Sequence, residues 1–156
     1  QSIDFKEESY SLYNILKEKN DDVFNSATQF KSWTINDVLY HLHVWNNAAY
    51  LSLTDEKKFS KFMEDFFKAI KQGKSARSYE KELSNNKSGQ DLLLEWKNGY
   101  EKISKEFLKA DPKKRVKWAG PDMSVRSSIT INQFLHQEYL HALHFESVPL
   151  WALYFP

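Results

Sequence analysis

All histidines of the chain, which number 5, fall in two short stretches that could form helices. The stretches read NDVLYHLHVW and INQFLHQEYLHALHF, and their histidines are His41, His43, His136, His141 and His144. Zinc, nickel and similar divalent ions bind neutral imidazole and carboxylate groups, and three protein ligands leave a position open for water or substrate. Two helical histidine clusters that are far apart in the sequence therefore predict a metal site between the helices of a bundle.

The second cluster contains residues with the spacing of metal ligands on one helix. Side chains three or four positions apart point the same way, and His141 has this relation to both Gln137 and Glu138. His144 follows His141 at the same kind of spacing, and His41 from the first cluster could complete the set. A metal-bound water could then act as a nucleophile or base at about pH 7. The alternative interpretation is a set of ordinary surface or hydrogen-bonded core histidines, because no H-E-x-x-H motif occurs.

The composition excludes several other kinds of site and favours long helices. There is no cysteine, which excludes a disulfide scaffold, a thiolate metal site and a cysteine nucleophile. Neither a G-x-S-x-G nucleophile elbow nor a nucleotide-binding glycine motif occurs. Aromatic residues make up 15%, and Gly and Pro number only 4 each, which favours an all-α domain with few turns.

Length and charge indicate a single soluble domain. A chain of 156 residues is long enough for one good core. Positive and negative residues are interspersed and sum to +1, so we expect neither nucleic acid nor a membrane surface as a partner. No apolar run approaches the roughly 20 residues of a membrane span, and no signal-peptide pattern occurs. We therefore expect a cytoplasmic protein.

Apolar residues recur with helical spacing in several segments, which we predict to be helices. The segments are 3–25, 34–53, 55–72, 91–110 and one that begins between 124 and 130 and ends near 145. Thr34 and Asp37 are predicted to form a capping box at the start of the second helix. Gly73 suits the end of the third helix. The polar stretch 72–90 is predicted to be a crossover loop that could contain one helical turn.

The helical positions predict which polar residues face the core. On the second helix, His41 belongs to an apolar stripe, whereas His43 lies roughly 200° away and faces a flank. The members of this stripe are Val38, His41, Leu42, Trp45, Ala48 and Ala49. On the last helix, a predicted stripe places a carboxylate and an imidazole between two phenylalanines, which is unusual for a plain packing face. The members of that stripe are Phe134, Glu138, His141 and Phe145. The apolar tail 149–156 is predicted to pack on the bundle or on a partner.

The start of the second helix resembles a known family. The run Trp33-Thr34-x-x-Asp37-x-x-x-His41-Leu42 resembles the W-[ST]-x-x-D-x-x-x-H-L signature of the DinB-like superfamily. It is most similar to the branch that contains the N-terminal domain of mycothiol-dependent maleylpyruvate isomerase and related metal-binding proteins. Further stretches agree in the same order, namely Leu53-Thr54-Asp55 leading into Phe59, then 92–96, then Trp118-x-Gly120-Pro121-x-Met123-Ser124. The resemblance implies an up-down-down-up four-helix bundle, with 72–90 as the long crossover.

The resemblance also implies a divalent metal, zinc or nickel, at one end of the bundle. In the family, one histidine of the second helix and an E-x-x-x-H or H-x-x-x-H pair of the last helix bind this metal. His41 matches the first ligand, and His141 with Glu138 or Gln137 would supply the others. His144 would support these ligands or replace one of them, and Trp45 would line the pocket wall.

Two alternatives to this assignment stay open. Counting without gaps from Met123-Ser124 places Leu135 and Tyr139 at the ligand pair of the last helix, and neither would bind a metal well. If the site is intact, we expect a metal-dependent reaction on a small molecule, either a hydrolysis or a transfer or isomerisation that uses a low-molecular-weight thiol. If it is not, we expect a metal-free bundle that binds a small molecule or forms a homodimer.

Overall fold

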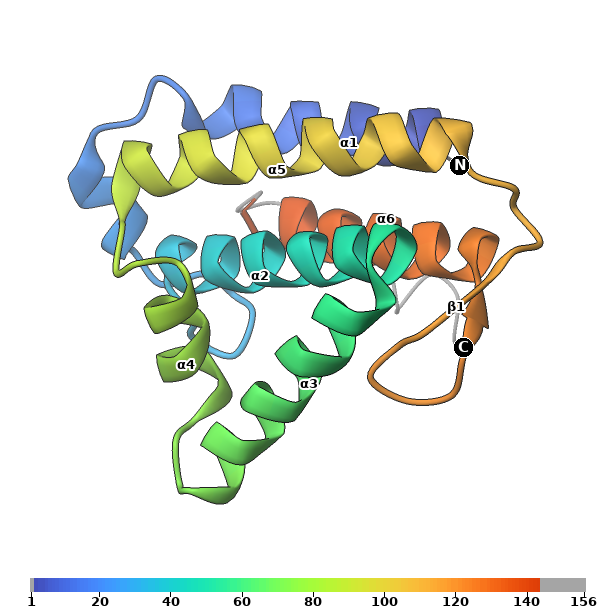
Figure 1. Ribbon diagram of the computed structural model, residues 1–156. Helices are drawn as coiled ribbons and strands as arrows, with labels where there is room; N and C mark the ends of the chain where they lie inside the picture. The colour runs from blue at the N-terminus through green and yellow to red at the C-terminus, as the bar shows by residue number, and fades with distance from the viewer. Residues whose placement is uncertain (1, 144–156) are drawn as a thin grey trace, which may run out of the picture.

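A computed structural model describes the backbone of residues 2–143 and the side chains of residues 2–138. The predicted all-α bundle is confirmed. Four long helices form it: α1 (Ser2–Leu16), α2 (Ile35–Thr54), α5 (Gly89–Lys109) and α6 (Val125–Leu143). Each of α1 and α2 packs against both α5 and α6. In Figure 1, α2 and α5 run in one direction and α1 and α6 run in the other.

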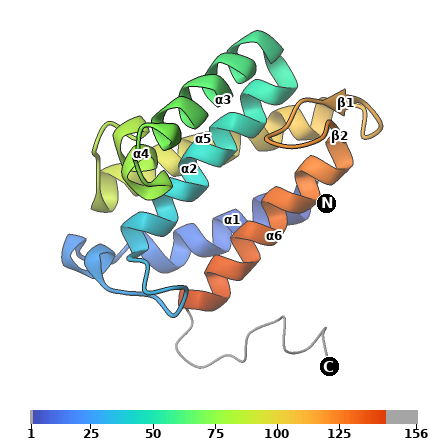
Figure 2. The ribbon, with the colours of Figure 1, turned by 90° about the horizontal axis from the view of Figure 1, so that it is seen from below.

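Two further helices connect α2 to α5 outside the bundle. Helix α3 (Glu56–Lys71) leaves the end of α2, and the shorter α4 (Ala76–Leu83) returns beside the start of α2, as Figure 2 also shows. The predicted crossover over 72–90 is present, but it contains the helix α4 where only one helical turn was expected. Ser75 caps α4, because its hydroxyl oxygen accepts a hydrogen bond from the Ser78 backbone N–H at 3.2 Å.

The remaining boundaries differ in smaller ways from the prediction. Helix α1 ends at Leu16, and the rest of the predicted segment 3–25 forms a turn and the short 3₁₀ helix η1 (Asp21–Asn25). Consecutive Asn and Asp side chains favour such turns over a continued α-helix. The loop before α6 contains a small antiparallel pair, β1 (Arg115–Val116) and β2 (Met123–Ser124). None of the described helices is both long and apolar enough to cross a membrane.

Helix α6 turns a different face to the core than its periodicity predicted. Phe134, which the predicted stripe placed inside, is 56% exposed, and Glu138 is half-buried. The buried stripe instead consists of Val125, Ile129, Asn132 and His136. Phe134 lies two positions before His136, so the two side chains point roughly 200° apart. Packing of Val125 and Ile129 against the main core selects this face. The side chains of His141 and Phe145, and the whole tail 149–156, lie outside the described residues.

The predicted capping box at the start of α2 is confirmed. The Thr34 hydroxyl accepts the Asp37 backbone N–H at 3.1 Å, and the Asp37 carboxylate accepts the Thr34 backbone N–H at 2.9 Å. These bonds satisfy donors at the helix start that have no partner within the helix. The box fixes where α2 begins, and therefore where its histidines lie.

Replacing the capping hydroxyl should destabilise the protein measurably. We expect Thr34→Ala to lower the free energy of unfolding by about 1 kcal/mol, because the Asp37 N–H loses its acceptor. Thr34→Ser keeps a hydroxyl at the same position and should stay within a few tenths of a kcal/mol of the unmodified chain. Urea denaturation followed by circular dichroism measures both values. Equal stability of the alanine and serine variants would contradict the assigned cap.

Candidate functional site

His41 is held by a buried carboxylate that comes from α4. Its Nδ1 lies 2.9 Å from Oε1 of Glu80, and Nε1 of Trp45 donates to the same oxygen at 2.9 Å. The Glu80 side chain is 2% exposed and that of His41 is 20% exposed. A carboxylate oxygen only accepts hydrogen bonds, so Nδ1 of His41 carries the proton in this pair. Nε2 is then the ring nitrogen through which His41 can exchange a proton or bind a metal ion.

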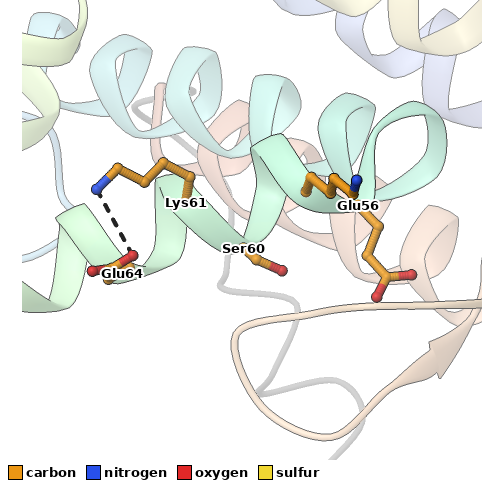
Figure 3. Close-up of a pocket in the computed structure, with 5 residues that line it drawn as sticks. Glu56, Ser60, Lys61 and Glu64 are labelled. Carbon is orange, nitrogen blue, oxygen red and sulfur yellow. Dashed lines mark ion pairs between the residues drawn. The ribbon is translucent and has the colours of Figure 1, made fainter.

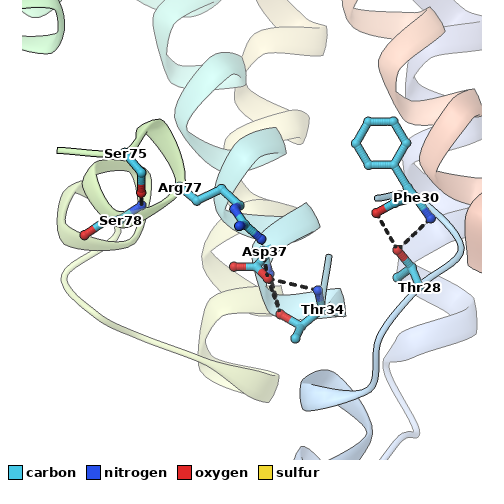
Figure 4. A network of polar contacts seen from close by, with 7 residues as sticks. All are labelled: Thr28, Phe30, Thr34, Asp37, Ser75, Arg77 and Ser78. Atoms are coloured by element: carbon cyan, nitrogen blue, oxygen red, sulfur yellow. Dashed lines mark hydrogen bonds and ion pairs between the residues drawn. The ribbon is translucent and has the colours of Figure 1, made fainter. Parts of the chain in front are cut away.

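The start of α4 is attached to the start of α2, and this attachment positions Glu80. The Arg77 guanidinium lies 3.8 Å from the Asp37 carboxylate of the capping box and 5.7 Å from the centre of the Trp33 ring. Figure 4 shows Arg77 reaching from α4 toward Asp37, which is hydrogen-bonded to Thr34. Beyond the end of α4, the Tyr40 hydroxyl donates to the Lys87 carbonyl at 2.7 Å. These contacts hold α4 on both sides of Glu80.

Aromatic rings surround the imidazole of His41. The ring centres of Trp33 and Trp45 lie 5.6 Å and 6.0 Å from that of His41. Trp45 in turn contacts Phe66 of α3, with ring centres 5.6 Å apart, and Trp118 of the β1–β2 loop at 5.9 Å. The structure thus places Trp45 beside His41, at the junction of α2, α3 and the loop. The rings of Trp33 and Trp45 and the Glu80 carboxylate therefore all lie beside the imidazole of His41.

His136 is the α6 histidine that reaches the core, and sequence reasoning assigned it no role. It is 0% exposed, and its Nδ1–H donates to the Asn132 carbonyl at 2.6 Å. Its Nε2 is buried and has no hydrogen-bond partner in the described part of the chain. The ring packs between Phe5 of α1 and Trp96 of α5, at centre distances of 4.9 Å and 5.7 Å. The stripe Val125, Ile129, Asn132 and His136 was the sequence signal that could have revealed it.

Burial controls the charge of His136. Burial in the aromatic core lowers the pKa of His136 to about 4, the nearby charge of His41 acts in the same direction, and the bond to Asn132 opposes it. The imidazole is therefore neutral at neutral pH, with its lone pair on Nε2. Burial also raises the pKa of the neighbouring Tyr100 hydroxyl, which keeps that group protonated.

Of the other predicted ligands, the structure describes only the side chains of Gln137 and Glu138. Gln137 donates from Nε2 to a carboxylate oxygen of Glu8 on α1 at 2.5 Å. Glu138 is half-buried on the same helix. The side chain of His141 and the whole of His144 lie outside the described residues. The convergence of His141 and Glu138 on His41 therefore stays a prediction.

The described donor set does not fit a zinc or nickel site with three protein ligands. Among residues 2–138, no group of three or more His, Cys, Asp or Glu side chains is arranged to hold a metal ion. His41 and His136 are both oriented through Nδ1, as ligating histidines often are. The residue four positions before His136 is Asn132, however, and its amide is a weaker ligand than the expected carboxylate or imidazole. The imidazoles of His41 and His136 and the amide of Asn132 are therefore an incomplete set of ligands for zinc or nickel.

A surface hollow on α3 offers no comparable chemistry. It has a volume of about 600 Å³, and its lining residues are Glu56, Lys57, Ser60, Lys61 and Glu64. Figure 3 shows Glu56, Ser60, Lys61 and Glu64 along α3, where Lys61 and Glu64 form an ion pair at 3.7 Å. Both side chains of that pair are more than half exposed, so such a pair contributes little. We assign this hollow no function.

One comparison with known proteins gives a match. A family model described as the mycothiol maleylpyruvate isomerase N-terminal domain matches residues 5–143. No curated protein and no solved structure matches the chain significantly. The matched range runs from the first turn of α1 to the end of α6 and contains His41, Glu80 and His136.

Proposed function

The chain belongs to the mycothiol maleylpyruvate isomerase N-terminal domain family, and on this premise we propose that it catalyses a thiol-dependent isomerisation or transfer on a small molecule. The proposed proton-transfer group is His41, and Glu80 is its positioning residue. The observation that supports this assignment is the 2.9 Å contact between Nδ1 of His41 and the buried Glu80 carboxylate. A carboxylate in this position fixes the tautomer of the imidazole and stabilises its protonated form.

The chemistry needs a base because the thiolate, and not the thiol, is the nucleophile. In the proposed isomerisation, Nε2 of His41 takes the proton from the thiol, the sulfur adds to a carbon–carbon double bond conjugated to a carbonyl group, and the π electrons move onto the carbonyl oxygen. When the carbon–sulfur bond breaks, those electrons restore the double bond, and the departing thiolate takes the proton back from the imidazolium. In a transfer, a leaving group of the substrate departs instead with its bonding electron pair and takes that proton. The Glu80 carboxylate balances the positive charge of the imidazolium. Trp33 and Trp45 provide an apolar surface on which the substrate carbon skeleton can pack.

The proposal assigns no step to a metal ion, because the described residues supply an incomplete donor set. Elemental analysis of tag-free protein and of His41→Ala tests the metal-dependent alternative directly. About one equivalent of zinc or nickel that is lost in the variant would make His41 a metal ligand, with Glu80 orienting it. That result would overturn the assignment of His41 as the proton-transfer group.

Activity on the compounds in the family name tests the proposal. Maleylpyruvate isomerisation should require an added thiol, with mycothiol tried first and cysteine second. We expect His41→Ala to lower kcat/KM by about 10²-fold, since it removes the proton-transfer group. Glu80→Gln should lower kcat by roughly 10-fold to 100-fold and leave KM nearly unchanged, since it acts through His41.

A matched control is available on the same helix. Glu82 lies on α4 with its side chain 42% exposed and pairs only with Lys74 among the described residues. Glu82→Gln therefore makes the same chemical change without touching His41, and it should keep full activity. Equal activity of Glu80→Gln and Glu82→Gln, or thiol-independent turnover by the unmodified protein, would contradict the proposal.

A further inference from the structure

A second polar hollow, the His43 groove, lies between α2 and α5 on a flank of the bundle. Its volume is about 270 Å³, and the lining residues that matter here are His43, Asn46, Tyr50, Glu95, Gly99 and Lys102. Because His43 lies roughly 200° around α2 from His41, this groove is separate from the His41 site. The volume has room for roughly nine molecules of water size.

Two buried polar atoms of the groove residues lack partners within the described part of the chain. Asn46 is 2% exposed, and its Nδ2 has no acceptor. Nδ1 of His43 is also buried without a partner, while Nε2 of the same ring lies 3.9 Å from the Glu95 carboxylate. The carboxylate favours the ring proton on Nε2, so Nδ1 presents a lone pair. The groove therefore has a donor that lacks an acceptor and an acceptor that lacks a donor, and such groups are rare in native proteins.

Gly99 leaves space beside this unpartnered histidine nitrogen. A Cβ atom added at Gly99 would meet only Nδ1 of His43, at 3.9 Å, which is an ordinary contact distance. The packing of α5 therefore does not require glycine at this position, although glycine inside a helix is less favourable than alanine. The absence of a side chain keeps the space next to Nδ1 open.

The uncompensated charge of the groove is positive. Glu95 is already paired with Lys87 at 2.5 Å. Lys102 lies 3.7 Å from the centre of the Tyr50 ring and forms no ion pair with any acidic side chain in the described range. A ligand that completes this arrangement carries a negative group for Lys102 and Asn46 and a hydrogen-bond donor for His43.

We propose that the His43 groove binds a small carboxylate that carries a hydroxyl or amino group on the neighbouring carbon. The carboxylate accepts from Nδ2 of Asn46 and pairs with Nζ of Lys102. The hydroxyl or amino group donates to Nδ1 of His43, on the side where Gly99 has no side chain. Because both of these nitrogen atoms are buried, binding turns the Asn46 and His43 side chains toward the groove.

Nuclear magnetic resonance titration of the full ¹⁵N-labelled chain tests this site. L-lactate and L-alanine are the probes, and the signals of the Gly99 backbone amide and the Asn46 side-chain amide are the readout. We expect saturable shifts of both signals in the millimolar range with at least one probe, and the pair of probes distinguishes a hydroxyl from an amino ligand. Propionate lacks the donor group and lactamide lacks the charge, so each should bind at least tenfold more weakly than L-lactate. No saturable shift with either probe, or equal binding of propionate, would overturn the proposal.

Variants then locate the binding. Gly99→Ala should fold and gain thermal stability, yet bind the better probe at least tenfold more weakly, because its methyl group fills the space beside His43. Lys102→Gln should also weaken binding at least tenfold, while Lys105→Gln, an exposed lysine on the same helix, should leave it unchanged. Unchanged binding by Gly99→Ala would contradict the site. Loss of binding in Glu80→Gln instead would move the ligand to the His41 site.

Discussion

Acidification from neutral pH to about pH 4 should lower the free energy of unfolding by about 3 kcal/mol through His136 alone. Burial lowers the pKa of His136 from 6.5 to about 4 in the folded state. At a pH between these two pKa values, His136 is protonated in the unfolded chain and neutral in the folded chain. The stabilising contribution is therefore fully present above pH 6.5 and is lost as the pH falls toward 4. Burial lowers the pKa of His43 as well, which adds to the same trend.

His136→Gln separates this effect from the titration of carboxylates. Glutamine does not titrate, and its amide can still donate toward the Asn132 carbonyl. The variant should have a lower free energy of unfolding than the unmodified chain at neutral pH. This difference in free energy should become smaller as the pH falls from 6.5 to about 4. Urea denaturation at several pH values between 7 and 4 measures both curves. Parallel curves across this range would show that folding does not lower the pKa of His136.

Trp96→Ala should cost about 3 to 5 kcal/mol of unfolding free energy. Trp96 is 0% exposed at the centre of α5, where its ring contacts Tyr100 at 4.9 Å and His136 at 5.7 Å between ring centres. Removing the indole leaves a cavity between α5 and α6 that the surrounding rings can fill only in part. Such a loss equals a large fraction of the total stability of a typical domain.

Trp96→Phe is the matched control. It keeps an aromatic ring and removes the indole N–H, which has no hydrogen-bond partner in the described part of the chain. Because an unpartnered buried donor is itself unfavourable, the phenylalanine variant should lose less than half as much stability as the alanine variant. Chemical denaturation at neutral pH compares the two. A loss under about 1 kcal/mol for Trp96→Ala would mean that the ring is not part of a tightly packed core.

Local patterns in the sequence were sufficient to predict the bundle. Composition and apolar periodicity indicated long helices, and Thr34 and Asp37 marked the start of α2 through hydrogen bonds that form within one turn. The signature around His41 identified the family, and the family model matches residues 5–143. These features depend on neighbours within a few positions, so the sequence displays them directly.

The partners of the histidines depended on the tertiary structure. Glu80 follows His41 by 39 positions, and the two meet because α4 docks on α2 through contacts that include Arg77 with Asp37 and Tyr40 with the Lys87 carbonyl. The polar stretch that contains Glu80 resembled a loop, since the few contacts that stabilise α4 come from another helix. No local pattern in the sequence records such a contact.

The face that α6 turns inward was decided in the same way. Two stripes on α6 contain both apolar residues and a histidine, and periodicity alone favoured the one with Phe134. The packing of Val125 and Ile129 against the core buried His136 instead and left Phe134 56% exposed. The sequence by itself therefore determined the helices, the start of α2 and the family. Only the tertiary structure decided which imidazole is buried in the core and which is held by a carboxylate. Both depend on how several helices pack against one another.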